Sequence, residues 1–444
     1  MQHEPSATQP GLLKYTARDI RKSLRLLTVS WPFGAAFRAI MDGAAYTAFL
    51  TTYLPINDTS FGLIRAAGWA AVIFLVLGSY VVERTGHAKR YVIGIASAER
   101  YLWLIVAAIA LLPASQHVGL KSWLIAIVAF TSCALGSFGG VGWHVWVSGI
   151  VPRAIAGSFF GLRSRWGIVS MVLTSLGVGV LLHFYGGAGW AYALLFGLAA
   201  VMGTVEFLLW LPIPEIPQPV DPHPPTLVSV LTLPWRHPYF RKYASFYGCY
   251  AFAVAMMGPF IWRYCFDSRQ HHGLGMSPFT AQLVLVIIPW IMMAMTASFW
   301  GKAIDRHGLK PVIVVSSLGL TLVSALWIVT HPGILWLPWL IAVLSGLFMP
   351  GYEQVLEYLL LKGFPAERRA SYNAGLHLVT GIAGMVGVVC GGLLAQYWQH
   401  QLPEIAWLPA WVSHYHPLFL ASVLLRVAIS ALLAPALPAR ACPR

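Results

Sequence analysis

Charged residues are scarce in this 444-residue chain, at 10% of the composition, while 58% of the residues are hydrophobic. Soluble globular domains carry about 25% charged residues, so this composition excludes an ordinary soluble protein. The sequence also contains no nucleophile motif, no phosphate-binding glycine loop and no other catalytic constellation. We therefore expect neither an enzyme nor a protein that uses ATP by itself, and we expect no cofactor.

Cysteine is similarly sparse, with five residues scattered along the chain. Their spacing matches neither a zinc site nor a disulfide framework. What the chain has in abundance is long apolar runs, and its mean hydropathy is +0.69. A run of about 20 apolar residues is long enough to cross a bilayer as a helix.

Twelve such runs are present, at approximately 28–54, 63–82, 91–112, 122–150, 164–185, 189–211, 243–266, 280–300, 311–330, 334–360, 372–398 and 412–435. The sequence thus predicts an all-α integral membrane protein with twelve transmembrane helices. A formal net charge of +14 could suggest a nucleic-acid partner. The basic residues, however, concentrate in the tails and in loops that would share one face of the membrane. This bias predicts a multi-pass protein of the inner membrane with both termini cytoplasmic, and no nucleic-acid partner.

A proline-rich segment divides the predicted helices into two sets of six. Residues 212–242 contain seven prolines between Pro212 and Pro225, which cannot sustain a helix and favour an extended connection. The expected organisation is therefore an amphipathic cytoplasmic segment at 1–27, a six-helix bundle at 28–211, the linker at 212–242, a second bundle at 243–436 and a tail at 437–444.

Two short basic segments repeat half a chain length apart. Glu83-Arg84-Thr85-Gly86 leads to Lys89-Arg90, and Gly301 precedes Asp305-Arg306-His307-Gly308, which leads to Lys310. Both lie between long apolar runs. They resemble the signature loop of the major facilitator superfamily, which lies between helices two and three and recurs between helices eight and nine. The first copy departs from that pattern, since Glu83 stands for Asp and Ser79 for the preferred Gly.

This resemblance implies two pseudo-symmetric six-helix halves that alternately open a central cavity to each side of the membrane. It also implies a transporter for a small solute, which we expect to be a monomer. Trp143-His144-Val145-Trp146 and Pro259-Phe260 are similar to a bacterial branch of the superfamily with tryptophan-rich fourth helices. The cytoplasmic gate would then comprise Glu83, Arg84, Gly86, Arg90, Gly301, Asp305, Arg306, Gly308, Glu357 and Arg368.

Charged residues inside the apolar runs are the candidates for function, because a charge in mid-bilayer costs at least about 2.5–3.5 kcal/mol and needs a partner or a cavity. Arg38 and Asp42 are four residues apart, so they share one helix face, and Tyr46 extends it by one turn. This face is either a substrate or proton site, with Asp42 as the titrating group, or a self-neutralising pair that orients the helix.

Glu353 and Glu357 are likewise four apart, near the cytoplasmic end of the tenth run. Two like charges on one face oppose joint ionisation, which suits proton coupling. Alternatively they hold the inner gate by pairing with arginines such as Arg306 or Arg368. We favour the gate for Glu357 and leave Glu353 open between the two roles. His144 occupies the position equivalent to Glu357 in the first half, as a gate or site residue or as a packing residue.

Four further charged residues are expected to form a structural network rather than a site: Glu99, Arg100, Glu206 and Arg426. Glu99 and Arg100 lie on a helix that supports the bundle in the resembled fold, and Glu206 or Glu99 would pair with Arg426. The leading hypothesis is thus a secondary active transporter that is coupled to protons. The alternatives are a non-transporting sensor or assembly partner of the same fold, and, as a minor one, a transporter of copper or another soft metal that uses histidine and methionine.

Overall fold

The computed structural model describes residues 16–54, 56–152, 155–215, 226, 228, 232–360, 364, 369–402, 409 and 411–438. Most of these residues are helical, and none of them is in a β-strand. The helices of the first half are α1 (Ala17–Asp42), α2 (Ala44–Ala48), α3 (Asp58–Ala70), α4 (Ile73–Thr85), α5 (Ala88–Tyr91), α6 (Ser97–Ala110), α7 (Val118–Ile150), α8 (Ala156–Tyr185) and α9 (Gly189–Trp210). Those of the second half are α11 (Pro238–Phe266), α12 (Pro278–Gln282), α13 (Ile288–His307), α14 (Leu309–Leu326), α15 (Leu337–Tyr358), α16 (Arg369–Gln401) and α17 (Tyr415–Leu432).

Eleven helical stretches within this described part are long and apolar enough to cross a membrane. The remaining predicted span, 28–54, is also helical but is broken at Gly43, so that α1, α2 and a π-helical turn at Phe49–Tyr53 together cover it. The chain is therefore an all-α, multi-pass membrane protein, and the expected count of twelve spans agrees with the structure when the broken helix is included.

Helix α1 begins well before the apolar run that predicted it. Its first turn is closed by a capping box, in which the Thr16 side chain accepts a hydrogen bond from the Asp19 backbone and Asp19 bonds back to the Thr16 backbone. From there the helix continues through the expected boundary at residue 27 to Asp42. Residues 17–27 are thus an extension of the first span, and the first fifteen residues lie outside the described part.

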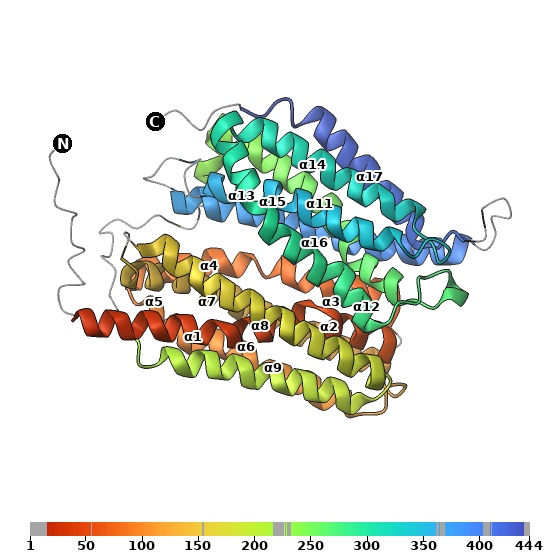
Figure 1. The fold of residues 1–444 in the computed structure, drawn as a ribbon, viewed down its shortest axis with the longest axis horizontal. Helices are drawn as coiled ribbons and strands as arrows, with labels where there is room; N and C mark the ends of the chain where they lie inside the picture. The colour runs from red at the N-terminus through yellow and green to blue at the C-terminus, as the bar shows by residue number, and fades with distance from the viewer. Residues whose placement is uncertain are drawn as a thin grey trace.

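The two halves of the chain form two groups of helices that lie side by side (Figure 1). They contact each other chiefly where α3 packs on α16 and where α12 packs on α8. At the first contact Gly62 faces Gly392, and a side chain at Gly62 would press against the backbone of α16. Small residues allow such close approach of membrane helices, where van der Waals packing drives association.

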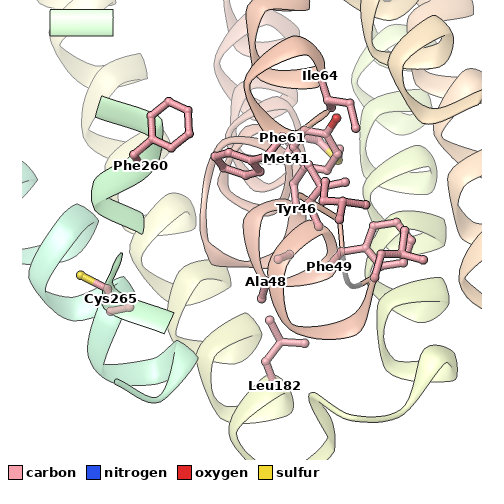
Figure 2. Close-up of a cluster of buried hydrophobic side chains, with 14 of the residues drawn as sticks. Met41, Tyr46, Ala48, Phe49, Phe61, Ile64, Leu182, Phe260 and Cys265 are labelled. Atoms are coloured by element: carbon pink, nitrogen blue, oxygen red, sulfur yellow. The ribbon is translucent and has the colours of Figure 1, made fainter. Parts of the chain in front are cut away.

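The buried hydrophobic clusters of the described residues that join the two halves lie away from the signature loops. The smaller of them packs Ala66 of α3 against Ala255 of α11 and Val388 of α16. The larger cluster joins both halves at the end opposite the signature loops, and there the ring of Phe61 meets that of Phe260 edge-on at 5.6 Å (Figure 2). At the signature-loop end the described residues form two clusters instead, one within each half. Trp146 belongs to the first of these and Tyr247 to the second. The halves are therefore packed together at one end and packed separately at the other.

Each signature loop turns on a glycine. Gly86 ends α4 with a φ of 68° and Gly308 ends α13 with a φ of 82°. Both angles lie in the left-handed region that residues with a Cβ avoid. Beyond the turn, the Lys89 ammonium donates to the carbonyls of Leu211 and Ile213, at 2.8 and 2.6 Å, and so ties the first loop to the end of α9.

Gly86→Ala should therefore destabilise the protein, because alanine in the left-handed conformation costs about 1–2 kcal/mol. We expect a lower apparent melting temperature of the purified protein in detergent. Gly161→Ala, at a helical site with no neighbour within 4 Å of the added methyl group, is the matched control and should not lower it. Equal melting temperatures for the two variants would contradict the importance of the turn.

Candidate functional site

A cavity of about 530 Å³ lies inside the first half. Its walls come from α1, α2, α3, α6 and α7 and include five charged residues: Arg38, Asp42, Arg65, Glu99 and Arg100. Its aromatic and apolar walls include Phe37, Tyr46, Trp69 and Trp103. Five charged side chains around one internal space in a membrane bundle make this the strongest candidate site in the described part of the molecule.

Arg38 and Asp42 both open onto this cavity, as their shared helix face predicts. Asp42 is the last residue of α1, immediately before the break at Gly43. Among the described residues neither side chain forms an ion pair within 4.0 Å, although Arg38, Arg65 and Arg100 all act electrostatically on Asp42. The pair is exposed to the cavity rather than locked together. Tyr46, by contrast, is 5% exposed, and its ring lies edge-on to Trp103 at 5.2 Å.

A second cavity of about 320 Å³ adjoins the first and shares Arg38, Glu99, Arg100 and Gly136 with it. Arg163 lines this second space, where its guanidinium lies 4.0 Å from the centre of the Trp31 ring. Cation–π contact of this kind holds a buried arginine without a carboxylate partner. The two cavities together extend the charged interior from Asp42 toward the signature-loop end of α1.

Glu99, Arg100 and Glu206 form one chain of ion pairs between α6 and α9. Arg100 lies 3.3 Å from Glu99 and 3.2 Å from Glu206, and Arg100 and Glu206 are 6% and 2% exposed. Glycines make the room for it: a Cβ at Gly34 would overlap the Glu206 carboxylate, and one at Gly203 would overlap Arg100. The chain fits the predicted structural network, but Glu99 and Arg100 also line the cavity and so belong to the candidate site.

Arg426 lies elsewhere. It is buried in α17 of the second half, where it donates to the Ser324 hydroxyl and lies 5.7 Å from the centre of the Tyr250 ring. The structure thus gives Glu206 a partner in Arg100, and it gives Arg426 partners within its own half. The expected pairing of Arg426 with a first-half glutamate is absent from the described ion pairs.

Asp58 and Arg263 form an ion pair across the two halves. Arg263 Nε lies 2.9 Å from Asp58 Oδ1, and Arg263 Nη2 donates to the Ile56 carbonyl at 2.6 Å. Asp58 is 1% exposed and sits in the first turn of α3, where the helix dipole also favours its negative charge. The Arg263 side chain therefore reaches across to the first half.

Three more residues of the second half complete this contact, which we call the latch (Asp58, Arg263, Asp267, His414 and Tyr415). His414 Nε2 lies 3.2 Å from Asp58 Oδ2, and the Tyr415 hydroxyl lies 3.3 Å from Asp58 and 3.0 Å from Asp267. Burial raises the pKa of Asp267, and the Arg263 guanidinium partly opposes this shift. The latch is a buried polar network that holds the two halves together. It lies at the end of the molecule opposite the signature loops, which we call the latch end.

A second polar contact between the halves lies at the helix break. Gln282, buried at the end of α12, accepts a hydrogen bond from the Ala44 backbone at 2.7 Å. That amide begins α2 and has no partner within its own helix. A Cβ at Gly43 would lie 2.9 Å from Gln282 Nε2, so glycine is needed for the close approach. The second half therefore caps a helix of the first half at Ala44, two residues beyond Asp42.

The predicted gate residues of the signature loops lie at helix ends. Asp305 and Arg306 are exposed at the end of α13, Arg84 covers the Tyr80 ring at 4.4 Å, and Arg90 is exposed. The side chain of Glu83 lies outside the described part. Gly301 lies within α13. Among the described residues, the side-chain hydrogen bonds of these loops stay within one half, as when Lys310 donates to the Pro435 carbonyl at 2.6 Å.

Glu353 and Glu357 follow each other on α15, with Glu353 half-buried and Glu357 exposed. Glu357 is close enough to act electrostatically on Glu353, and within the described residues neither is in an ion pair. Arg368 is outside the described residues, so its predicted pairing with Glu357 remains a prediction. His144 lies in α7, and its side chain is likewise outside the described part. No group of three or more described His, Cys, Asp or Glu side chains is arranged to hold a metal.

Sequence reasoning missed Asp58, Arg65, Gln282, His414 and Tyr415. Asp58 escaped because the second apolar run was taken to begin at residue 63, whereas α3 begins at Asp58. Arg65 lies near the start of that run and was not recognised as a residue of the cavity. A usable signal was present: Asn57 caps the Ser60 amide and Asp58 follows it, which is a typical helix start. The second-half residues had no such signal, because their role depends on how the halves meet.

Asp58→Asn should loosen the latch, because it leaves the buried Arg263 without its ion-pair partner. Losing such a partner costs about 1–3 kcal/mol or more, which shifts the ratio of closed to open latch about tenfold or beyond. Spin labels on cysteines at Thr52 and Gln270, exposed residues of the two halves, would report the separation in a background without the native cysteines. We expect a population at longer distance.

Asp19→Asn is the control for the latch experiment, because this exposed carboxylate lies at the far end of α1. It should leave the distance distribution unchanged. If Asp58→Asn also gives the wild-type distribution, the ion pair does not hold the halves together.

Comparison with known proteins points to one family. Residues 270–441 match the family model described as Major Facilitator Superfamily. A protein of Citrobacter koseri named MdtD, for multidrug resistance, is 32% identical over 128 residues, which is 28% of this chain and 26% of that protein. Its counterpart in Klebsiella pneumoniae is 30% identical over 162 residues, or 36% and 33% of the two chains. The matches therefore span a third or less of these relatives.

Solved structures match over nearly the whole chain. A variant of the nucleoside transporter NupG superposes with a TM-score of 0.70 at 16% identity, covering 94% of this chain and 100% of the other. A bacterial homologue of the lysosomal transporter Spinster, in an inward-facing state, gives 0.63 at 15% identity, over 95% and 98%. A D-xylose–proton symporter gives 0.61 at 16% identity, over 95% and 98%. At such low identity the likeness establishes the fold.

Proposed function

Because the chain belongs to the Major Facilitator Superfamily, we propose that it is a secondary active transporter that moves a small solute by alternating access. The observation that carries the proposal is the uneven joining of the two halves. At the latch end they share one hydrophobic cluster and the Asp58–Arg263 pair, while at the signature-loop end each half has its own cluster. This is the arrangement expected of one of two alternating states.

The other state requires the latch end to open and the signature-loop end to close. Breaking Asp58–Arg263 exposes two charges to water, which offsets much of the cost of separating them. At the opposite end, exposed Asp305 and Arg306 and the Glu353–Glu357 pair are available to make new contacts between the halves. We assign the signature-loop end to the cytoplasm of a bacterial inner membrane, with both termini on that side, because its loops are rich in Lys and Arg.

The cavity of the first half is the proposed solute site, and Asp42 is the proposed proton carrier. Asp42 opens onto the cavity, has Arg38 one turn away, and precedes the helix break that the second half caps through Gln282. Movement of the halves would therefore change the surroundings of this carboxylate. A carboxylate whose environment alternates can bind a proton on one side and release it on the other.

A non-transporting sensor of the same fold would keep the cavity but would not alternate. Cys133 lines the cavity and separates the two functions. In proteoliposomes of a variant that retains Cys133 alone, a membrane-impermeant maleimide should label it from either side, in proportions that shift with pH or ligand. The sensor hypothesis predicts labelling from a single side under all conditions, and that result would refute transport.

Asp42→Asn removes the charge of the proposed carrier with little change in shape. We expect loss of concentrative transport driven by a pH gradient, while exchange of solute across the membrane persists. The solute would come from a thermal-shift screen of the purified protein, and flux would be measured in liposomes. Asp42→Glu should retain partial coupling with an altered pH profile.

Glu353→Gln is the matched control, since it removes a half-buried carboxylate from the second half. It should weaken accumulation less than Asp42→Asn does. If Asp42→Asn still drives accumulation and Glu353→Gln does not, the proton travels through α15 instead, and the Arg38–Asp42 face is structural.

A further inference from the structure

We propose that the 530 Å³ cavity binds a small organic monoanion, a carboxylate on a flat apolar body, held by Arg38, Arg65 and the Tyr46 hydroxyl. This inference rests on the proposed function and names the class of solute. It follows from three observations: the balance of charges around the cavity, an unpaired buried hydroxyl, and the chemistry of the remaining walls.

The charges around the cavity do not balance. The charged groups that line it and the adjoining cavity are four arginines (Arg38, Arg65, Arg100 and Arg163) and three carboxylates (Asp42, Glu99 and Glu206), so one positive charge is in excess. Arg100 is already shared between Glu99 and Glu206, which lies behind it. Within the described residues neither Arg38 nor Arg65 is in an ion pair, although Glu99 and Glu206 as well as Asp42 act electrostatically on Arg38. An uncompensated cation inside a membrane protein is costly, so an anionic ligand is favoured.

Arg65 and Tyr46 are placed to act together. The Arg65 guanidinium lies 5.7 Å from the centre of the Tyr46 ring, which fixes the arginine at the cavity wall. The Tyr46 hydroxyl is buried and has no hydrogen-bond partner in the described part of the chain. A buried hydroxyl without a partner is unusual and calls for an explanation. A carboxylate oxygen beside Arg65 would accept its hydrogen bond.

The other walls suit the body of the ligand rather than a bare inorganic anion. Phe37, Met41, Ile64, Trp69 and Trp103 provide aromatic and aliphatic surface. Trp103 donates its indole N–H to the Ser132 hydroxyl at 2.9 Å, so the edge of its ring is already satisfied and its face contributes apolar contact. A cavity of this volume falls within the range of about 300–1,000 Å³ typical of small-molecule sites.

The same geometry links the anion to the proton. A ligand carboxylate near Arg38 and Arg65 competes with the Asp42 carboxylate for their positive charge. Binding of the anion therefore favours protonation of Asp42, and one anion and one proton would cross together as an electrically neutral pair. No net charge is then added to the cavity when the solute is loaded.

Three probes of equal size test the charge of the solute: benzoate, benzamide and benzamidine, which are anionic, neutral and cationic. Binding to the purified protein in detergent would be measured by tryptophan fluorescence and by protection of Cys133, on the cavity wall, from N-ethylmaleimide. We expect benzoate to bind and to protect Cys133. Benzamide should bind at least about tenfold more weakly, and benzamidine should give no protection.

Variants assign the binding to the named residues. Arg65→Gln and Tyr46→Phe should each weaken benzoate binding about tenfold, whereas Arg65→Lys should retain part of it. Arg269→Gln, an exposed arginine in the loop after α11, is the matched control and should bind benzoate as the unmodified protein does. Melting temperatures would show that each variant is folded.

The proposal is overturned if benzoate gives no protection up to tens of millimolar, or if benzamide or benzamidine protects as well as benzoate. It is also overturned if folded Arg65→Gln binds benzoate normally. Binding in detergent does not require transport, so these results would not test the proposed function. The labelling of Cys133 from the two sides of the membrane tests that function separately. Benzoate binding without any change of accessibility would refute transport and leave the anion site standing.

Discussion

A charge inside a bilayer needs either a partner or water, and the interior of this protein is organised around that constraint. Where partners exist, the groups are buried and packed, as in the chain from Glu99 through Arg100 to Glu206. Where they do not, the groups open onto an internal cavity, as do Arg38 and Asp42. The cavity thus allows these charges to remain unpaired inside the membrane, because burying them without it would cost several kcal/mol each.

The two halves share signature loops but divide the chemistry unequally. Both cavities lie in the first half, between α1, α6 and α7, with Arg163 of α8 on the second. The second half instead packs a dense aromatic cluster around Tyr247 and Tyr250, and its arginines bond locally or reach across the interface. One half therefore resembles a binding unit, and the other supplies the groups that close it at the latch end.

The sequence was sufficient for what depends on one helix at a time. Run lengths located the spans, and the spacing of Arg38, Asp42 and Tyr46 put them on one cavity. It was insufficient where partners come from distant helices. Arg263 lies near the outer end of its predicted span, and its neighbours along the chain do not indicate its partner Asp58, which lies over 200 residues earlier in the other half. Nor could apolar periodicity reveal the break at Gly43, which depends on a glutamine supplied by α12.

The hydrogen bond from the Ala44 amide to Gln282 has a kinetic consequence. For the latch end to open, Gln282 has to withdraw from the Ala44 amide, which then has no acceptor until water or another group replaces it. An unpaired amide in a dry environment costs about 1–3 kcal/mol, a penalty met on the way between the two end states rather than in either of them. The contact therefore raises the energy barrier between the two states and so limits how often the molecule changes state. The latch and the loops determine which of the two states is more stable.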